Sequence, residues 1–342
     1  MRIGTRGSAL ALAQARLVAG WLGGAEIVVV RTPHDGAHPE GTRQASGDTP
    51  VRDHPNGGGN GRGTWTRGGD KSRWVAELEQ ALLAGEIDLA VHSAKDVPGE
   101  LSGGLELLGA PARAAAEDAL IGAGSLEELP EGACVGTSSV RRSAQLRSAR
   151  ADLKVVSLRG NVDTRLRKLA SGLAGSGEVT EGPTDGREPP LHAIVLASAG
   201  LWRLGRERDI GCTLDATRFV PAPGQGSLAL QARTGDAPVS AAVEAILDKD
   251  ASACLKAERA VAHALGASCN TPLGAHAVPS GRGGLDLRAW VGLPDGSEWV
   301  GDELLGGFYD PDELGRRVAD RMEAVGAREL LRRAEEMVGE RG

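Results

Sequence analysis

The chain has 342 residues and a formal net charge of −7 at pH 7. This length is enough for two or three domains, and the negative charge argues against general binding of polyanions, so any basic site has to be local. Aromatic residues make up only 3% of the chain, so Val, Leu, Ile and Ala must fill the cores, which favours layered domains of helices and sheets.

The N-terminal segment turns polar at Arg2 and has no continuous apolar stretch of the kind that signal peptides contain. No segment approaches the roughly 20 apolar residues that a membrane-spanning helix needs. No C-x-x-C pair is formed by the four cysteines, Cys134, Cys212, Cys254 and Cys269. This spacing argues against a disulfide framework and against a zinc site. These features predict a cytoplasmic protein without a metal site.

Short apolar segments alternate with helical patterns along residues 1–200, which is typical of parallel α/β layers. The predicted strands are 1–5, 25–31, 87–91, 133–136, 154–158 and 193–197. The predicted helices are the segment from Ser8, which caps it, to Trp21, and then 74–84, 140–149 and 162–169. Cys134 and Cys212 lie in apolar strand-like segments and Cys254 lies on a predicted helix, so these three side chains are interpreted as packing.

From about residue 251 the pattern changes to two helical runs, 254–265 and 311–338, around strand candidates at 285–291 and 298–305. This arrangement predicts a separate α+β domain. Two other stretches, 33–67 and 171–190, are predicted to be mobile loop insertions, because they are rich in glycine and polar residues and show no periodicity. The first has neither a G-x-G-x-x-G nor a P-loop pattern, which favours a linker over a phosphate-binding loop.

Three predicted strands end in short polar turns that carry arginine or hydroxyl groups and open a helix. The turns begin at Thr5, Thr137 and Leu158. In open parallel sheets, ligands bind beyond the carboxyl ends of the strands, where helix N-termini attract anions and arginine pairs with carboxylates. Because aromatic stacking residues are nearly absent, a small anion is favoured over nucleic acid.

The charge balance supports a local anion site, since residues 137–170 contain nine Lys and Arg but only two Asp. A solvated helix face is the simpler explanation for some of these charges, namely Arg147, Arg150, Arg167 and Lys168. The arginines at the strand ends are better explained by binding of an anion.

The segment from His92 to Pro98 brings a carboxylate and a lysine to the end of an apolar strand. A carboxylate there, Asp96, is suited to stabilise a cationic intermediate or to move a proton. A structural ion pair with Lys95 is the alternative.

Cys269 follows a helix that ends at Gly266 and lies in a tight loop before Pro272. A loop cysteine is more accessible than a cysteine in a core, which makes Cys269 a candidate reactive thiol. An inert thiol is the alternative, since reactivity depends on the surroundings.

Taken together and in this order, these segments resemble the porphobilinogen deaminase family. The matching segments are 2–15, 88–98, 135–146, 157–166, 193–205 and 221–226, together with the loop around Cys269. They cover nearly the whole chain apart from the two insertions. Seven segments in register are far more specific than any one of them.

The resemblance implies an α/β fold of two periplasmic-binding-protein-like, doubly wound domains and a smaller α+β C-terminal domain. Domain 1 would comprise 1–112 and 227–246 and carry the catalytic aspartate. Domain 2 would comprise 117–222 and carry the substrate-binding arginines, and domain 3 would comprise 249–342 and carry the cofactor-bearing cysteine loop. The protein is expected to be a monomer.

The resemblance also implies a transferase of tetrapyrrole and heme biosynthesis, which joins four porphobilinogen molecules into hydroxymethylbilane and releases ammonia. The product would grow on a dipyrromethane cofactor attached to Cys269 by a thioether, and Asp96 would be catalytic. The other implied cofactor-binding residues are Lys71, Ser93, Lys95, Thr137, Ser138, Ser139, Arg141 and Arg142. The implied substrate-binding residues are Arg6, Ser8, Arg159, Arg165, Arg203 and Gln225.

A further segment, residues 69–74, departs from the family pattern of Gly-Gly-Lys-Gly followed by an apolar residue and Phe. Here Lys71 keeps its place, but Asp70 and Ser72 replace two glycines, so the mobility of the segment and the role of Lys71 stay open.

A non-catalytic, two-lobed module that binds carboxylates or senses an effector is the main alternative. Such a module explains the arginines at the strand ends, but it explains neither the third domain nor the loop of Cys269. An acyl- or phosphoryl-transfer enzyme needs a nucleophile elbow, a base triad or a P-loop, and the sequence shows none of these.

Overall fold

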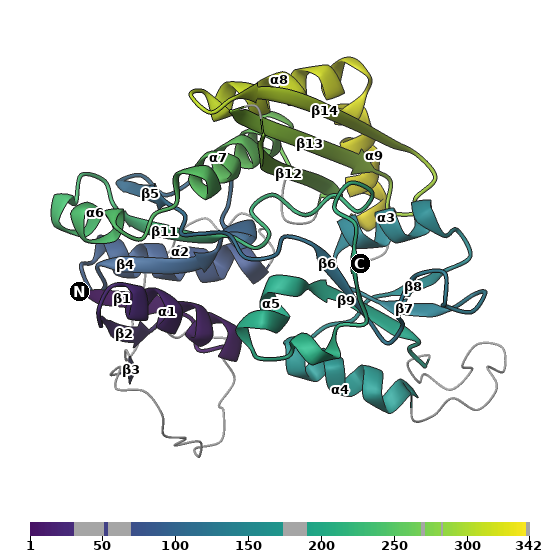
Figure 1. Ribbon diagram of the computed structural model, residues 1–342, viewed down its shortest axis with the longest axis horizontal. Helices are drawn as coiled ribbons and strands as arrows, with labels where there is room; N and C mark the ends of the chain where they lie inside the picture. The colour runs from purple at the N-terminus through teal and green to yellow at the C-terminus, as the bar shows by residue number, and fades with distance from the viewer. Residues whose placement is uncertain (31–50, 54–69, 174–189, 268–270, 282, 340–342) are drawn as a thin grey trace. The chain divides into compact units, whose positions relative to one another are not determined.

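The computed structural model describes residues 1–30, 51–53, 70–173, 190–267, 271–281 and 283–339 (Figure 1). The chain forms two compact units. Unit 1 comprises Met1–Arg113 and Ser227–Ser252, and unit 2 comprises Ala114–Gly226 and Ala253–Gly342. The loop of Cys269 and most of the two predicted insertions lie outside the described residues.

Unit 1 is built on a six-stranded sheet with the order β3-β2-β1-β4-β11-β5. Its strands are β1 (Arg2–Thr5), β2 (Glu26–Val29), β3 (Val51–Asp53), β4 (Leu89–Ser93), β5 (Leu105–Gly109) and β11 (Leu228–Arg233). The first four strands in this order run parallel, whereas β11 is antiparallel to β4 and to β5. Its helical elements are α1 (Ala9–Trp21), α2 (Asp70–Leu83), the 3-10 turn η1 (Ala94–Asp96) and α6 (Ala237–Glu244).

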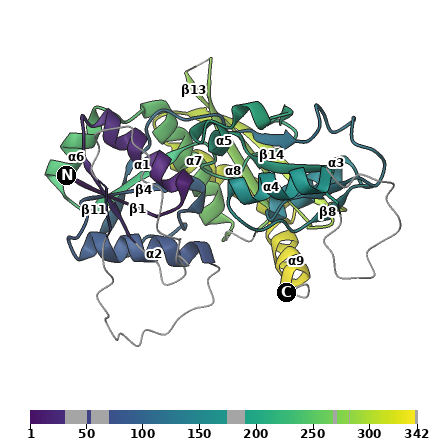
Figure 2. The same cartoon turned by 90° about the horizontal axis from the view of Figure 1, so that it is seen from below.

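Helices cover both faces of this sheet because its strands are apolar on both sides. Ile27 of β2 packs in one core cluster with Val18 of α1, whereas its neighbour Val28 packs in another with Leu82 of α2. Successive side chains of a strand point to opposite faces, so a continuous apolar strand needs a cover on each side. Figure 2 shows α1 and α2 on opposite sides of β1 and β4.

Unit 2 contains a five-stranded sheet with the order β10-β6-β9-β7-β8. Its strands are β6 (Asp118–Ile121), β7 (Cys134–Gly136), β8 (Lys154–Val156), β9 (Ala193–Ala197) and β10 (Cys212–Leu214). The helical elements around it are α3 (Val140–Ala149), α4 (Val162–Leu173), α5 (Ser198–Arg203) and the 3-10 turn η2 (Glu207–Asp209). Leu146 of α3 packs with Val195 on one side, and Leu166 of α4 packs with Ile194 on the other, so this sheet is also covered on both faces.

The C-terminal part of unit 2 is an antiparallel, three-stranded sheet packed on helices. It consists of β12 (Leu273–Ser280), β13 (Gly284–Gly292) and β14 (Trp299–Gly307), with α8 (Pro311–Ala324), α9 (Ala327–Gly339) and most of α7 (Lys249–Ala264), whose residues up to Ser252 belong to unit 1. These strands and helices share one apolar core. A smaller cluster of Ala144, Val220 and Trp290 joins this part to α3.

The predicted α/β class, with two doubly wound sheets and a smaller α+β part, is confirmed. Cys134, Cys212 and Cys254 lie in β7, β10 and α7, as predicted. No helix in the described ranges combines the length and the apolar character needed to span a membrane.

The structure corrects two local predictions. The run 311–338 is two helices rather than one, because Gly326 adopts a φ of +97° between α8 and α9. Regular structure also extends into both predicted loop insertions. Residues 51–53 form β3 and pair with β2, and α4 continues to Leu173.

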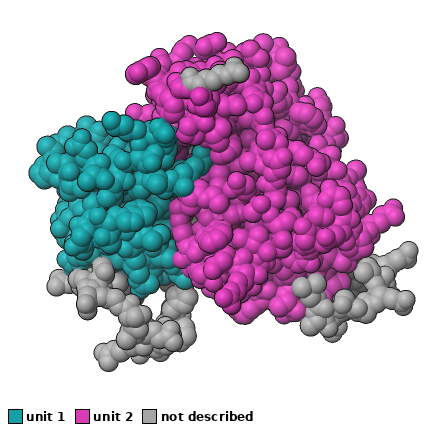
Figure 3. Space-filling model, in the orientation of Figure 1, with its two compact units in different colours: residues 1–113, 227–252 teal, residues 114–226, 253–342 magenta. Residues whose placement is uncertain are grey.

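The two compact units are coloured separately in Figure 3. Residues 253–342 group with residues 114–226, and contacts such as the 2.7 Å hydrogen bond from Arg147 to the carbonyl of Pro294 contribute to this grouping. The boundaries of the three predicted domains stay a prediction.

Candidate active site

A small cavity of about 80 Å³ lies in unit 1 beside the carboxyl ends of β1 and β4. Its lining includes four predicted site residues, Arg6, Ser8, Ser93 and Asp96. The strands β1 and β4 are parallel neighbours, so the residues that follow their ends meet at one edge of the sheet. The structure thus brings together the catalytic candidate and three of the predicted binding residues.

Local hydrogen bonds hold these side chains in place. The hydroxyl of Ser8 caps α1 by accepting from the backbone N–H of Ala11 at 3.3 Å, and the hydroxyl of Ser93 accepts from Gln14 at 2.8 Å. Asp96 ends η1, in which the N–H of Val97 donates to the carbonyl of Ala94. The carboxylate is therefore carried by a hydrogen-bonded turn rather than by an extended loop.

Two predicted lysines have different positions. Lys95 lies in η1 beside Asp96, but it is not among the described residues that line the cavity. Lys71 lies in the first turn of α2, and its side chain falls outside the described part of the chain.

Unit 2 contains a buried charged cluster around Asp118, a residue that the sequence analysis does not single out. Asp118 is 1% exposed, and its carboxylate accepts from Arg141 at 2.8 Å, from Arg142 at 2.9 Å and from Gln225 at 2.7 Å. Burial raises the pKa of Asp118, but the two guanidinium groups outweigh this effect and hold the pKa well below its usual range. Asp118 therefore remains a carboxylate inside the protein.

Further hydrogen bonds connect this cluster with the backbone of unit 2. Arg141 donates to the carbonyl of Val220 at 2.8 Å, and Arg142 donates to that of Val195 at 3.2 Å. Gln225 is 1% exposed and also donates to the carbonyl of Ala116 at 2.7 Å. The cluster thus connects α3, β6, β9 and residues 220–225. Binding of the cofactor by Arg141 and Arg142, and of the substrate by Gln225, stays a prediction.

Three other predicted arginines, Arg159, Arg165 and Arg203, form no ion pair with any described carboxylate. Arg165 donates to the carbonyl of Gly160 at 2.8 Å and to the hydroxyl of Ser138 at 3.0 Å, and Arg203 donates to the carbonyl of Gly226 at 2.6 Å. Burial, with the nearby charge of Arg142, lowers the pKa of Arg165, and burial lowers the pKa of Arg203 to about 10. A partly buried cation that no anion neutralises is unfavourable, so both side chains favour an anionic ligand.

The turns that carry these groups explain their positions. β7 and β8 are parallel neighbours, which places the turn at 137–139 beside the turn at 159–161. Thr137 accepts from the N–H of Ser139 at 3.2 Å, and Ser139 caps α3.

Gly226, whose carbonyl accepts from Arg203, has a φ of +88°, and a Cβ there would lie 2.4 Å from the carbonyl oxygen of Ala114. Only glycine can therefore present its carbonyl to Arg203 in this way.

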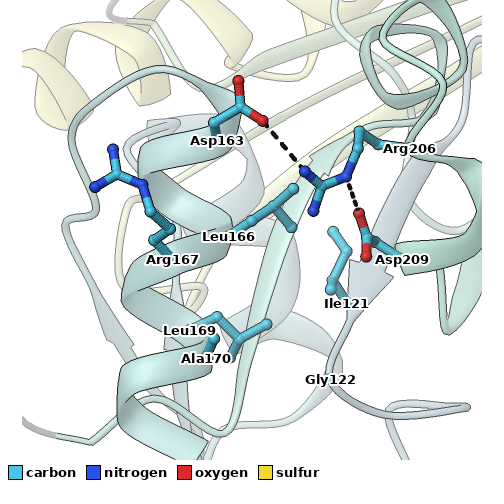
Figure 4. A pocket seen from close by; sticks show the side chains of 9 residues that line it. All are labelled: Ile121, Gly122, Asp163, Leu166, Arg167, Leu169, Ala170, Arg206 and Asp209. Carbon is cyan, nitrogen blue, oxygen red and sulfur yellow. Dashed lines mark hydrogen bonds and ion pairs between the residues drawn. The ribbon is translucent and has the colours of Figure 1, made fainter.

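A second cavity, of about 480 Å³, is lined by α4, η2 and β6 (Figure 4). The guanidinium of Arg206 lies between Asp163, at 3.3 Å, and Asp209, at 2.5 Å. The other lining residues include apolar side chains such as Leu166 and Leu169. This cavity is larger than the first, but none of the predicted site residues lines it, and its two carboxylates already pair with Arg206. It is therefore not the candidate active site.

Asp118 in unit 2 was not predicted from the sequence. Neither were Gln14 and His92, which line the first cavity, nor Glu79 and Gln231, which lie behind it. Glu117 and Asp118 together open an apolar strand, and this acidic start of a strand is a signal that indicates Asp118.

Comparison with known proteins identifies related chains. Residues 1–241 match the family model "Porphobilinogen deaminase, dipyromethane cofactor binding domain", and residues 252–324 match "Porphobilinogen deaminase, C-terminal domain". The chain is 42% identical over 335 residues to the porphobilinogen deaminase of Rubrobacter xylanophilus, covering 96% of this chain and 95% of that protein. It is 41% identical over 332 residues to that of Deinococcus radiodurans, covering 96% and 97%. Among solved structures, it is similar to a nutrient-binding protein from Burkholderia cenocepacia bound to methionine, with a TM-score of 0.36 and 11% identity, covering 71% of this chain and 90% of the other.

Proposed function

Because the chain belongs to the porphobilinogen deaminase family, we propose that it is a transferase of tetrapyrrole and heme biosynthesis. It joins four porphobilinogen molecules into hydroxymethylbilane and releases ammonia. Both parts of the family are matched, and the matches cover nearly the full length of the relatives. The structural observation that supports this function most directly is the presence of arginines without a carboxylate partner among the described residues.

The substrate accounts for these arginines. Each porphobilinogen carries an acetate and a propionate group, so the growing product brings many carboxylates to the protein. Guanidinium groups bind carboxylates in a two-pronged geometry. The proposed partners among these arginines are Arg159, Arg165 and Arg203. Arg6, Ser8 and Gln225 are proposed as further substrate-binding residues.

The residues present also fit a dipyrromethane cofactor, because they combine cations that form no ion pair with a described carboxylate, Arg165 and Arg203, with the hydroxyl groups of the turn at 137–139. We propose that Cys269, which lies outside the described residues, holds the cofactor by a thioether. When bound, the cofactor supplies the free pyrrole carbon on which the product grows. The proposed partners of its side chains are Lys71, Ser93, Lys95, Thr137, Ser138, Ser139, Arg141 and Arg142.

Asp96 is the proposed catalytic residue. Loss of ammonia from porphobilinogen leaves positive charge on the pyrrole nitrogen, and a carboxylate held beside that nitrogen stabilises the charge. The position of Asp96 at the end of η1, in the lining of the small cavity, suits this role. The same carboxylate is placed to take up the proton that the ring carbon loses after the new bond forms.

Intact-mass spectrometry tests the proposal. Protein produced in cells that make porphobilinogen is expected to be heavier than its sequence by a two-pyrrole adduct. Cys269→Ser should remove the adduct, whereas Cys212→Ser, a cysteine of β10, should keep it. Finding only the unmodified chain in the unsubstituted protein would contradict the cofactor and favour a carboxylate-binding module instead.

We further propose that the protein acts in the cytoplasm as a monomer, with porphobilinogen as its partner. Light scattering of the purified protein at micromolar concentration should give the mass of one chain.

A further inference from the structure

A chain of buried hydrogen bonds lies behind the small cavity of unit 1. Nε2 of His92 is 2.9 Å from Oε1 of Gln231, and Nε2 of Gln231 donates to Oε1 of Glu79 at 2.7 Å. The second oxygen of Glu79 accepts from the hydroxyl of Ser102 at 2.5 Å. His92, Gln231 and Glu79 are all buried. His92 also lines the cavity that contains Asp96.

The pairing of two distant strands creates this chain. In the β4–β11 pair, His92 lies opposite Ala229 and Ala90 lies opposite Gln231. His92 and Gln231 are therefore diagonal neighbours on one face of the sheet, within reach of long side chains. The helix α2 packs on this face and contributes Glu79. Packing and hydrogen bonding together fix the imidazole ring.

The direction of the hydrogen bonds in this series defines the tautomer of His92. The carboxylate of Glu79 accepts hydrogen bonds, so the amide of Gln231 turns its NH₂ group toward Glu79 and its oxygen toward His92. That oxygen requires a donor, which places the imidazole proton on Nε2. Burial lowers the pKa of His92 against the opposing effects of Gln231, Glu79 and Asp96, so the ring is neutral. The lone pair of the ring is then on Nδ1.

The second nitrogen of His92 therefore remains available as an acceptor. Within the described residues, the only hydrogen bond of the His92 ring is that of Nε2. The cavity lining combines the carboxylate of Asp96 and the guanidinium of Arg6 with hydroxyl groups and apolar side chains. A second carboxylate there would repel Asp96 and raise its pKa. A neutral imidazole adds an acceptor without adding charge.

We propose that Nδ1 of His92 accepts a hydrogen bond from an N–H group of the pyrrole substrate and positions the substrate against Asp96. The inference rests on the proposed function, because it takes the pyrrole substrate from it. Porphobilinogen offers two N–H donors, the ring N–H and the aminomethyl ammonium group. Both have the chemistry that a neutral imidazole nitrogen recognises.

Two substitutions separate the two nitrogens of His92. Glutamine carries its amide near the position of Nε2, so His92→Gln keeps a group that can bond to Gln231 but removes the acceptor at Nδ1. Asparagine carries its amide near the position of Nδ1, so His92→Asn keeps a polar group at the cavity but leaves Gln231 without its donor. Ser102→Ala removes the hydrogen bond to Glu79, at the end of the hydrogen-bond series that is farthest from His92. It is the matched control for a loss of stability alone.

We expect His92→Gln to unfold at nearly the same urea concentration as the unsubstituted protein, while kcat/KM for porphobilinogen falls by about 2- to 10-fold, the effect of one hydrogen bond. His92→Asn should unfold at lower urea but recover most of the lost kcat/KM per folded molecule. Ser102→Ala should lower only the stability.

Two results would contradict the proposed contact. One is an unchanged kcat/KM in His92→Gln. The other is a loss of activity in all three variants that is proportional to their loss of stability. An unsubstituted protein that consumes no porphobilinogen would instead contradict the proposed function. The two failures are therefore distinguishable.

A pyrrole that carries both carboxylate side chains but lacks the aminomethyl group identifies the donor. If the ring N–H is the donor, His92→Gln should weaken binding of this inhibitor by the same factor as kcat/KM. If the ammonium group is the donor, the Kd of the inhibitor should not change while kcat/KM still falls. Either result, together with the fall in kcat/KM, supports the contact, whereas no change in both measurements contradicts it.

Discussion

At the scale of single residues, Asp96 combines a fixed backbone with a position in the lining of a small cavity. General acid–base and electrostatic contributions of a positioned carboxylate commonly amount to a factor of about 10² to 10⁴. We therefore expect Asp96→Ala to lower the rate of porphobilinogen consumption by at least about 100-fold. Asp163→Ala, in the second cavity, should leave this rate within about twofold. Near-normal turnover in Asp96→Ala would refute the role given to this residue.

Asp118 is expected to be important for stability, because it neutralises two buried guanidinium groups. Removing one partner of a buried ion pair leaves uncompensated charge and costs about 3–5 kcal/mol. Asp118→Asn should lower the free energy of unfolding in urea by about this amount. Asp163→Asn, which breaks a largely exposed pair with Arg206, should cost far less, because solvent screens exposed ion pairs. Equal effects of the two substitutions would contradict the importance of Asp118.

The depressed pKa of Asp118 also sets the pH range of this effect. Its contribution to stability is fully present above the unfolded-state pKa, about 3.9, and is lost only as the pH falls through the lower folded-state pKa. The difference in unfolding free energy between the unsubstituted protein and Asp118→Asn should therefore stay constant from pH 7 to about pH 5. It should shrink only in stronger acid. A difference that shrinks above pH 5 would contradict the depressed pKa.

Ser8 and Asp96 could be selected from the sequence because each follows the end of an apolar strand. Both line the small cavity, since the two strands are neighbours in the sheet. The partners of the buried polar groups could not be predicted in this way. His92 and Gln231 are 139 residues apart in the chain, and their contact follows only from the pairing of β4 with β11. The salt bridges of Arg141 and Arg142 to Asp118 could not be predicted either, because nothing in the local sequence of α3 indicates a partner at residue 118.

At the scale of elements, apolar segments followed by capping residues were sufficient to predict β1, β7, β9 and α3 to within about two residues. Several short elements were missed, namely β5, β6, β11, β12, α5 and α6. Short strands such as β6 are stabilised by pairing with a distant neighbour, here β9, and carry little periodicity of their own.

Gly326 provides a test of why α8 and α9 are separate helices. Its φ of +97° is a conformation that L-residues rarely adopt, although the space around it is open. We expect Gly326→Ala to lower the free energy of unfolding by about 1–2 kcal/mol through backbone strain alone. Gly339→Ala, at the end of α9 and without a positive φ, should change it by less than about 0.5 kcal/mol. A neutral Gly326→Ala, measured by thermal unfolding, would show that the turn tolerates a Cβ.

At the scale of the whole molecule, the two units have separate apolar cores. Leu230 of β11 is fully buried in the core of unit 1, and truncation of such a side chain costs about 2–5 kcal/mol. We expect Leu230→Ala to accelerate amide hydrogen exchange in β1, β4 and β11 while leaving β12, β13 and β14 protected. Equal acceleration in both units would show that they unfold together.

The position of β11 between β4 and β5 has a consequence for synthesis on the ribosome. Both neighbours of β11 emerge early, but the strand that joins them is translated only after the whole sheet of residues 118–214 has been made. Until then β4 and β5 each expose an unpaired edge, which is a template for wrong association. The sheet of unit 1 is thus completed after the five-stranded sheet of unit 2. Slowing translation just before residue 228 should therefore prolong the interval in which the nascent chain depends on chaperones.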